Sequence, residues 1–428
     1  MDKMLTLLRP CVGLVVFFAL VSCSTFSARE HYQVKHLYPT SDPQFERTMN
    51  SLLGPNLLPG NEVVTLHNGD EIFPAMLRAI RGAKRSIDFE TYIYWKGRVG
   101  REFAQALADR ARAGVAVHVV LDWQGTLKLD NDSLQLMKDA GVEIVEYNPL
   151  RPYRPAFWYR PERFNNRTHR KLLIVDGKVG FTGGVGIADE WDGHAHDPQH
   201  YRDNHYRIEG PVVAELQAAF LDNWLRTNGS VLQGSDYFPP LEAVGSEKAQ
   251  AFKSSRRSGT ESARLMYLVS ITSASRSVRL ASAYFVPDNL AIDTLVEAAH
   301  RGVKIEIIVP GPHIDQQVVR QASRGTWPKL LAGGVRIYEY QPTMFHCKYM
   351  IVDDLWVSVG SSNFDSRSFR LNSEANVNVL DPGFARQQIA FFEQDKARSK
   401  EITLEMLKHQ PIWDKVLNKA VTPIKPEL

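Results

Sequence analysis

The chain has 428 residues, of which 44% are hydrophobic and 23% are charged, values typical of a globular protein. This length predicts two domains, or three, at about 100–200 residues each. Lysine and arginine exceed the acidic residues by 51 − 48 = 3, an excess too small to indicate a nucleic-acid-binding protein. The three cysteines, at positions 11, 23 and 347, exclude a disulfide framework and a cysteine-rich metal site.

The N-terminus has the pattern of a secretory signal. Two basic residues precede the apolar run 11–21, which is short for a membrane span and typical of a signal peptide. The run ends at Ser22 and Cys23, which is similar to the lipidation site of bacterial lipoproteins. We therefore expect residues 1–23 to be a lipoprotein signal peptide and Cys23 to carry the lipid outside the cytoplasm, with Ser24 favouring the outer membrane. An ordinary secretory signal, or an uncleaved anchor in the inner membrane, is the alternative.

The next segment, residues 24–60, is predicted to be a tether. Its second part has no clear hydrophobic period and contains Pro39, Pro43, Pro55 and Pro59, which interrupt regular structure.

From residue 63 the pattern alternates between strand and helix. Residues 63–69 and 86–95 have strand patterns on either side of a helical pattern at 70–85. An amphipathic helix over 100–114 then runs into a strand. Strands separated by helices of this length predict an α/β sheet with right-handed crossovers.

The same order of elements returns in the second half of the chain. The segment GVAVHVVLD at 114–122 is answered by GVKIEIIVP at 302–310, and AGVEIVEYNP at 140–149 is answered by GGVRIYEYQP at 333–342. We interpret the chain as a duplicated α/β unit.

The domain boundaries follow from this duplication. A stretch rich in Gly, Ser and Pro separates the two units and is predicted to be a linker over residues 231–260. The expected domains are residues 61–230 and 261–428, each closed by a helix, at about 211–227 and 383–400.

Each unit carries a histidine, a lysine and an aspartate at the spacing H-x-K-x4-D, beside a short apolar run. The two triples are His169, Lys171 and Asp176, and His346, Lys348 and Asp353. A glycine follows seven residues after each aspartate, at Gly183 and Gly360. A buried strand gains nothing from the histidine and lysine. Polar groups satisfied inside a core would not explain why the triple recurs at matching places, so the repetition indicates a function.

The double triple resembles the phospholipase D superfamily. Flanking phrases are similar to bacterial cardiolipin synthases, among them NNRTHRKLLIVDG, RDNHYRIEGPVV, RIYEYQPTMFHCK and GSSNFDSRSFRLNSEANV. The resemblance covers about residues 60–400. It implies duplicated phospholipase D-type domains, each a mixed sheet flanked by helices, with the active site at the interface of the two halves.

The resemblance also implies the roles of the histidines. A neutral imidazole can attack phosphorus, and a second, protonated one can supply a proton to the leaving alkoxide. By resemblance, His169 is the nucleophile that becomes a phosphohistidine and His346 is the general acid and base. Each histidine needs a carboxylate on its other nitrogen. The family pairs them crosswise, so that Glu374 is expected to support His169 and Asp203 to support His346.

The remaining motif residues are expected to bind phosphate or to shape the site. Lys171 and Lys348 can stabilise the charge of the transition state without a metal, and Ser361 and Asn363 can add hydrogen bonds. At the position of Asn363 the first unit has a glycine, Gly186, where the family usually has asparagine.

The two motif aspartates, Asp176 and Asp353, are expected to close strand turns rather than to touch substrate. We predict no cofactor and no catalytic metal.

Three other features allow more than one interpretation. Four histidines in the stretch 191–206 could form a metal site, although a polar loop is the simpler interpretation. Cys347 is expected to face the opposite side of the strand from its neighbours and to be packed. The insertion 151–164 is dense in arginine and aromatic residues. It is either a packed loop or a collar whose Tyr153, Phe157 and Trp158 dip toward lipid chains.

The leading hypothesis is a membrane-anchored phosphatidyltransferase that forms cardiolipin from phosphatidylglycerol. Phosphatidylethanolamine is an alternative donor. Hydrolysis of phospholipid, or of nucleic acid as in a superfamily nuclease, is the alternative reaction, and a lipid-binding scaffold is a third class that the paired histidines argue against. The expected partners are phospholipid substrates and the membrane surface, with no nucleic acid. Protein partners are left open.

Overall fold

The computed structural model describes residues 34–149, 165–256 and 261–410. The predicted signal peptide with Cys23 and the insertion 151–164 lie outside these ranges. From His36 onward the described residues form one compact unit.

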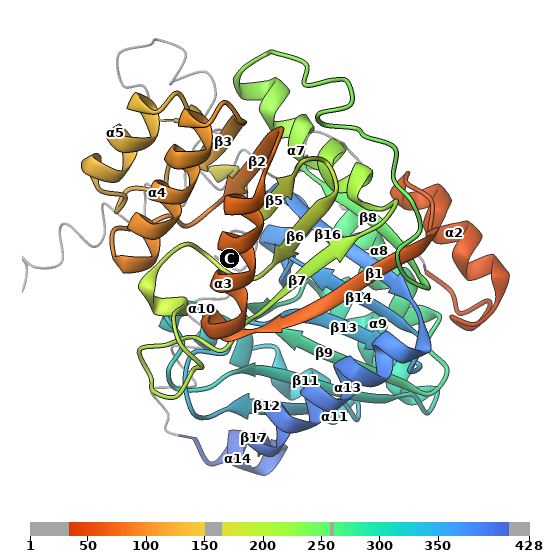
Figure 1. Cartoon of the computed structure of the whole chain (residues 1–428). Helices are drawn as coiled ribbons and strands as arrows, with labels where there is room; N and C mark the ends of the chain where they lie inside the picture. Colours follow the sequence, from red (N-terminus) through yellow and green to blue (C-terminus); the bar gives the residue numbers. More distant parts are fainter. Residues whose placement is uncertain (1–33, 150–164, 257–260, 411–428) are drawn as a thin grey trace, which may run out of the picture. The chain divides into compact units, whose positions relative to one another are not determined.

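Within the described ranges, fifteen strands form one mixed sheet (Figure 1). Their order is β17-β12-β11-β9-β13-β14-β16-β8-β1-β7-β6-β5-β2-β3-β4. The strands of the first half are β1 (Leu58–His67), β2 (Ser86–Thr91), β3 (Ala116–Asp122), β4 (Glu143–Tyr147), β5 (Leu172–Val175), β6 (Val179–Gly183) and β7 (Asn204–Glu209). Those of the second half are β8 (Glu247–Ser254), β9 (Ser277–Ser282), β11 (Lys304–Pro310), β12 (Arg336–Tyr340), β13 (Lys348–Val352), β14 (Trp356–Gly360), β16 (Glu374–Leu380) and β17 (Ser399–Ile402). Strands β10 (Phe285–Val286) and β15 (Phe364–Asp365) pair separately.

The sheet repeats one pattern outward from its centre. Strands β2, β3 and β4 are parallel, and so are β9, β11 and β12. In each half an antiparallel hairpin, β5–β6 or β13–β14, lies beside the parallel strands. The two halves meet where β1 pairs antiparallel with β8. The predicted duplicated mixed sheet is therefore confirmed.

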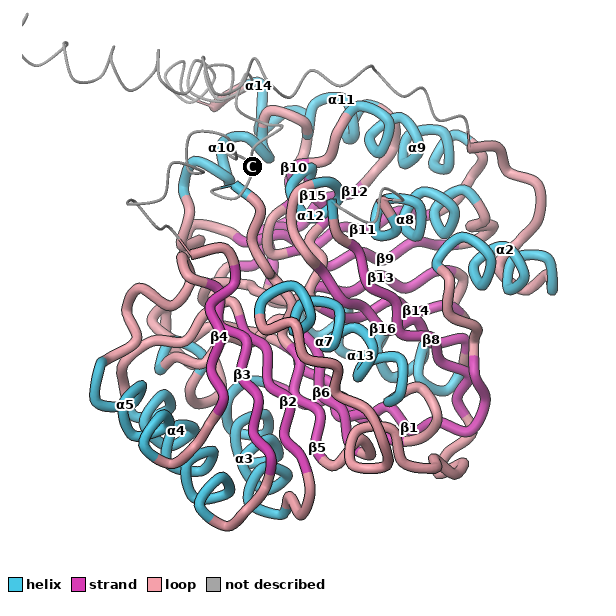
Figure 2. The backbone as a smooth tube through the Cα atoms, turned by 90° about the horizontal axis from the view of Figure 1, so that it is seen from above, coloured by secondary structure: helices cyan, strands magenta, loops and turns pink. Residues whose placement is uncertain are grey.

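Helices cover both faces of the sheet. They are α2 (Pro43–Leu53), α3 (Asn68–Gly82), α4 (Arg98–Arg112), α5 (Asn131–Asp139), α7 (Val213–Thr227), α8 (Ser262–Thr272), α9 (Asn289–His300), α10 (Gln317–Arg324), α11 (Trp327–Ala332), α12 (Ser366–Arg370), α13 (Pro382–Ala397) and α14 (Leu404–Lys408), with a short 3₁₀ helix η2 (Asp189–Trp191). Figure 2 shows α7 and α13 between the two rows of strands, with α3, α4 and α5 outside the first row and α8, α9 and α11 outside the second.

This layering explains the apolar strands. Strands β5 and β13 are buried along their whole length, because helices lie on both faces of the sheet. On the outer side, α4 buries Val99, Phe103 and Leu107 at helical spacing. On the inner side, α7 and α13 join strands of both halves in one core cluster. Cys347 belongs to this cluster and is fully buried, as the alternation of the strand predicts.

Two segments differ from the expectation of irregular structure. Part of the predicted tether forms α2, because Asp42 caps the helix and Pro43 occupies its first turn, where a proline costs nothing. Part of the predicted linker forms β8, which pairs with both β1 and β16 at the centre of the sheet. Among the described residues, none of the helices has the length and apolar character needed to cross a membrane.

Candidate active site

Two short backbone bridges bring the halves together next to the motif histidines. Thr168 pairs with Ser373, and Arg202 pairs with Phe345, each as an isolated parallel bridge. The backbone N–H of His169 donates to the carbonyl of Ser373 at 2.9 Å, and that of His346 donates to Arg202 at 2.7 Å. Each histidine therefore lies against a segment of the opposite half.

The first bridge places His169 beside Glu374. The Nδ1 atom of His169 lies 3.0 and 3.1 Å from the two carboxylate oxygens. Glu374 is fully buried and also accepts the hydroxyls of Ser361 at 2.5 Å and Ser368 at 2.9 Å. These three partners fix the carboxylate, which in turn fixes the orientation of the imidazole.

The second bridge places His346 beside Asp203. Their Nδ1 and Oδ2 atoms are 2.7 Å apart, and Asp203 is fully buried. The structure thus brings together the two crosswise pairs that the family resemblance implies. Their catalytic roles stay predictions.

The support of Asp203 differs from that of Glu374. Ser361 stands eight residues after Asp353, and the matching position in the first half is Gly184. A Cβ atom there would lie 2.2 Å from Oδ1 of Asp203, so no side chain fits. The indole N–H of Trp191, on η2, donates to Asp203 instead at 2.9 Å. The Trp191 ring also packs edge-on against His346, with centroids 5.2 Å apart.

The two motif lysines lie in the same buried region. Lys348 Nζ is 3.4 Å from Nε2 of His346 and donates to the His346 carbonyl at 2.7 Å. Lys171 Nζ makes the corresponding bond to the His169 carbonyl at 2.7 Å. Burial lowers the pKa of Lys171 to about 7, and the charge of Lys348 adds to this effect while Glu374 opposes it. An anionic phosphodiester between the lysines would stabilise both charges.

Burial also lowers the pKa values of the two motif histidines. It lowers the pKa of His169 to about 4 against the opposing charge of Glu374. Burial and the charge of Lys348 lower the pKa of His346. Burial opposes ionisation of Glu374, yet the contacts with His169 and Lys171 hold its pKa below the usual value. At neutral pH the site therefore holds a neutral His169 whose Nδ1–H faces an ionised carboxylate, which leaves the Nε2 lone pair available.

The motif aspartates lie at the other end of their strands. Asp176 follows β5 and accepts the backbone N–H groups of residues 84–86 at 2.7–3.1 Å. Asp353 follows β13 and accepts those of residues 275–277 at 2.7–3.0 Å. Both have φ of 53°, in the left-handed region that aspartate tolerates. These contacts agree with a structural role for both aspartates.

The expected phosphate donors are arranged differently from each other. Ser361 gives its single O–H to Glu374, so that donor is already in use. Asn363 is buried, and its Oδ1 accepts the backbone N–H of Tyr284 at 3.4 Å. A Cβ atom at Gly186, the matching position of the first half, would lie 2.6 Å from Ile93. Packing therefore explains why this unit has no asparagine there.

Sequence reasoning missed the aromatic residues around the histidines. The ring of Tyr92 lies 5.5 Å from that of His169 and 5.7 Å from Lys171 Nζ. The rings of Tyr201 and Tyr284 lie 6.0 and 6.3 Å from His346. Tyr92 and Tyr284 follow β2 and β9 at their carboxyl ends, where ligand sites of parallel sheets gather. That position was the signal that could have identified them. Trp191 and Ser368 gave no comparable signal.

Comparison with known proteins identifies the family. The family model described as "Cardiolipin synthase, PLD-like domain" matches residues 76–224 and 267–396. The chain belongs to this family. It is 35% identical over 371 residues to cardiolipin synthase 1 of Bacillus cereus, covering 85% of this chain and 72% of that protein. It is 33% identical over 369 residues to a cardiolipin synthase of Geobacillus sp., covering 86% and 72%.

Solved structures agree on the fold. A phosphatidylserine synthase of Haemophilus influenzae superposes with a TM-score of 0.68 at 15% identity, covering 90% of this chain and 100% of that one. A polyphosphate kinase of Porphyromonas gingivalis gives 0.53 at 14% identity, covering 94% and 58%. The recognition based on the double triple is confirmed, and the chain is a cardiolipin-synthase-like enzyme of the phospholipase D superfamily.

Proposed function

We propose that this enzyme transfers a phosphatidyl group to phosphatidylglycerol and so forms cardiolipin, through a phosphohistidine at His169. The observation that carries the proposal is the pair of buried imidazoles, each backed by a carboxylate from the opposite half. The names of the curated relatives, cardiolipin synthases, support the product.

In the first step, Nε2 of His169 attacks the phosphorus of a phosphatidylglycerol. A P–N bond forms and the P–O bond to the glycerol head group breaks. The departing alkoxide takes a proton from His346, and glycerol leaves. His346 is neutral in the resting site, so the anionic phosphodiester must raise its pKa, as a negative charge beside an imidazole does. Asp203 and the bound phosphate together then stabilise the imidazolium.

In the second step, the head-group hydroxyl of another phosphatidylglycerol attacks the same phosphorus. Its proton passes to His346, which is now neutral and acts as a base. The P–N bond breaks and His169 is restored. The sum is two phosphatidylglycerols giving one cardiolipin and one glycerol. Lys171 and Lys348 stabilise the transition-state charge in both steps.

Product analysis tests this function. The purified full chain is given vesicles of phosphatidylglycerol, and cardiolipin, glycerol and phosphatidic acid are measured. We expect cardiolipin and glycerol in equal amounts, with no product from His169→Ala and normal product from His300→Ala, a variant of an exposed histidine at the end of α9. Phosphatidic acid as the sole lipid product would instead identify a hydrolase. Adding phosphatidylethanolamine tests the alternative donor, since ethanolamine would then be released.

We also propose that Cys23 anchors the enzyme to a membrane outside the cytoplasm, in the outer membrane in particular. The support is the short apolar run before Ser22-Cys23 and the serine after it. Mass spectrometry of the membrane-extracted protein should find an N-terminus at a diacylglyceryl-modified Cys23. An intact Met1, or an unmodified Cys23, would contradict this proposal without affecting the proposed reaction.

A further inference from the structure

The loop between η2 and β7 carries histidines that the proposed reaction does not use. Both ends of its middle part are held by other elements. The carbonyl of Gly193 accepts the backbone N–H of Asp70, on α3, at 3.1 Å. The carbonyl of His200 accepts the hydroxyl of Thr343, in the second half, at 2.5 Å. The segment between these points is therefore a closed loop that touches both halves of the chain.

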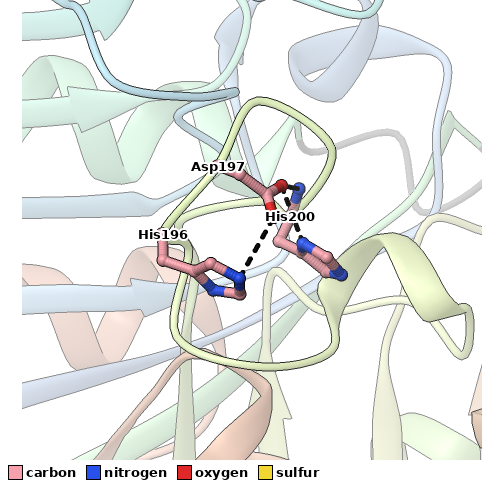
Figure 3. Close-up of side chains that lie close together, drawn as sticks. All are labelled: His196, Asp197 and His200. Atoms are coloured by element: carbon pink, nitrogen blue, oxygen red, sulfur yellow. Dashed lines mark hydrogen bonds and ion pairs between the residues drawn. The ribbon is translucent and has the colours of Figure 1, made fainter.

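Three side chains of this loop converge on one point. His196, Asp197 and His200 each offer a ligand atom, and these atoms lie within 4.8 Å of one another (Figure 3). Nε2 of His196 is 3.1 Å from Oδ2 of Asp197, and Nδ1 of His200 is 2.8 Å from Oδ1. The two imidazole rings are stacked, with centroids 5.1 Å apart.

The carboxylate between the imidazoles is held in place. Oδ1 of Asp197 also accepts the backbone N–H groups of Gln199 and His200, at 2.9 and 3.2 Å. This local turn fixes the carboxylate, and the two histidines reach it from either side. The carboxylate of Asp197 is therefore already ordered before a metal ion binds.

The spacing of the cluster suits a small metal ion. Metal bonds of about 2.0–2.2 Å place tetrahedral ligands about 3.3 Å apart, close to the two carboxylate–imidazole distances of 3.1 and 2.8 Å. Each imidazole already lies close to the carboxylate, so metal binding mainly requires the two imidazoles to move toward each other. Their exposure leaves room for this movement, since 51% of the His196 side chain and 30% of the His200 side chain are exposed. Two imidazoles and one carboxylate form a ligand set that zinc binds well.

We propose that His196, Asp197 and His200 bind a divalent transition metal, Zn²⁺ in particular, and that the metal fastens the loop that leads to Asp203. Water completes the coordination. The three ligands precede Asp203 in the chain. The metal site is separate from the phosphodiester site, because these ligands contact neither motif histidine among the described interactions. Its effect is on the stability of the loop, because Asp203 has separate contacts with Trp191 and with the backbone of Asn204.

Direct binding tests the proposal without any lipid. The full chain in detergent competes with a chromophoric chelator for Zn²⁺ alone. We expect one high-affinity Zn²⁺ per chain and a loss of affinity of at least about tenfold in His196→Ala and in His200→Ala. His300→Ala is the matched control and should bind as the unmodified chain does. Absence of binding, or equal binding in all four proteins, would overturn the proposal.

A second measurement separates a structural metal from a catalytic one. Zn²⁺ should raise the thermal midpoint of the unmodified chain in a concentration-dependent manner, and should not raise that of His196→Ala. Cardiolipin formation should continue after exhaustive chelation. Activity that disappears on chelation and returns only with one divalent ion would contradict the fastening role, whichever phospholipid proves to be the substrate.

Discussion

At the scale of single residues, the two halves of the site are related but not equal. Besides its imidazole, Glu374 receives two hydroxyls, whereas Asp203 receives the indole of Trp191 and the backbone N–H of Asn204. The bulky Trp191 ring also covers His346, so that one residue both satisfies the carboxylate and packs the histidine that it serves. This difference suits two histidines with different tasks.

Replacing Trp191 with phenylalanine should test this positioning role. The variant keeps a ring beside His346 but leaves Asp203 without one hydrogen bond. The less satisfied carboxylate should hold the imidazolium more strongly and raise the pKa of His346. Because His346 must be protonated in the first step, we expect the alkaline limb of the kcat/KM pH profile to move to higher pH. We expect kcat to fall about tenfold, because hydrogen bonds to charged groups contribute about 1.5–3 kcal/mol.

Trp356→Phe is the matched control for that experiment. Trp356 also donates a buried indole hydrogen bond of 2.9 Å, to Ser270, away from the site. It should lower the thermal midpoint and leave the pH profile unchanged. An equal shift of the profile in both variants would mean that Trp191 acts only through general stability.

A buried histidine beside the site should make the enzyme sensitive to acid. Burial lowers the pKa of His205 to about 3. Between this pKa and about 6.5 the unfolded chain binds the proton and the folded chain does not, so stability rises with pH through that window and is lost as the pH falls. At pH 5.5 the loss is about 1.4 kcal/mol for this one group. Glutamine does not titrate, so the thermal midpoint of His205→Gln should fall less between pH 7 and 5.5 than that of the unmodified chain. An identical fall in both proteins would show that His205 does not cause the acid sensitivity.

At the scale of elements, short local contacts position the strands that carry the triples. The turn of each hairpin, β5–β6 or β13–β14, begins with the motif aspartate. Its carboxylate accepts three consecutive backbone N–H groups at the start of β2 or β9. These contacts fix the strands at the ends that lie opposite to the histidines. We therefore expect the motif aspartate to act on the register of the strand rather than on the phosphate.

Asp353→Ala should therefore reduce stability far more than it reduces catalysis. The change leaves three N–H groups without their acceptor and puts alanine in a left-handed conformation, at a cost of about 2–4 kcal/mol. Asp353→Asn keeps an acceptor oxygen and tolerates the conformation, so its loss should be smaller. Chemical denaturation and activity per folded molecule are the measurements. A folded Asp353→Ala protein with activity as low as that of His346→Ala would place Asp353 in the chemistry.

The elements also show what the sequence could predict. The strands and helices around the triples were predictable, since their apolar periods are strong and repeated. Helix α2 was not, because a proline usually interrupts a helix, and Pro43 starts one only because it follows the capping Asp42. Strand β8 was missed because its sequence, EKAQAFKS, is mostly polar and its place is set by pairing with β1 and β16. The contact of Trp191 with Asp203 depends on the missing side chain of Gly184, which no local pattern reveals.

At the scale of the whole molecule, the duplication makes one site from two incomplete ones. Each half supplies one histidine and the carboxylate that supports the histidine of the other half. The charge of Lys348 also acts on His169 and on Lys171, so the two triples are coupled. A chain that contains both halves can therefore divide nucleophilic attack and proton transfer between two imidazoles.

The division of labour between these histidines is the central claim, and rapid-quench trapping tests it most directly. Phosphatidylglycerol with a labelled phosphorus is mixed with the enzyme, and the labelled peptide is mapped. We predict label on the peptide that contains His169, none in His169→Ala, and slow accumulation in His346→Ala, because loss of general acid–base catalysis costs about 10²–10⁴ in rate. Label on the peptide that contains His346, persisting in His169→Ala, would contradict the account and exchange the two roles.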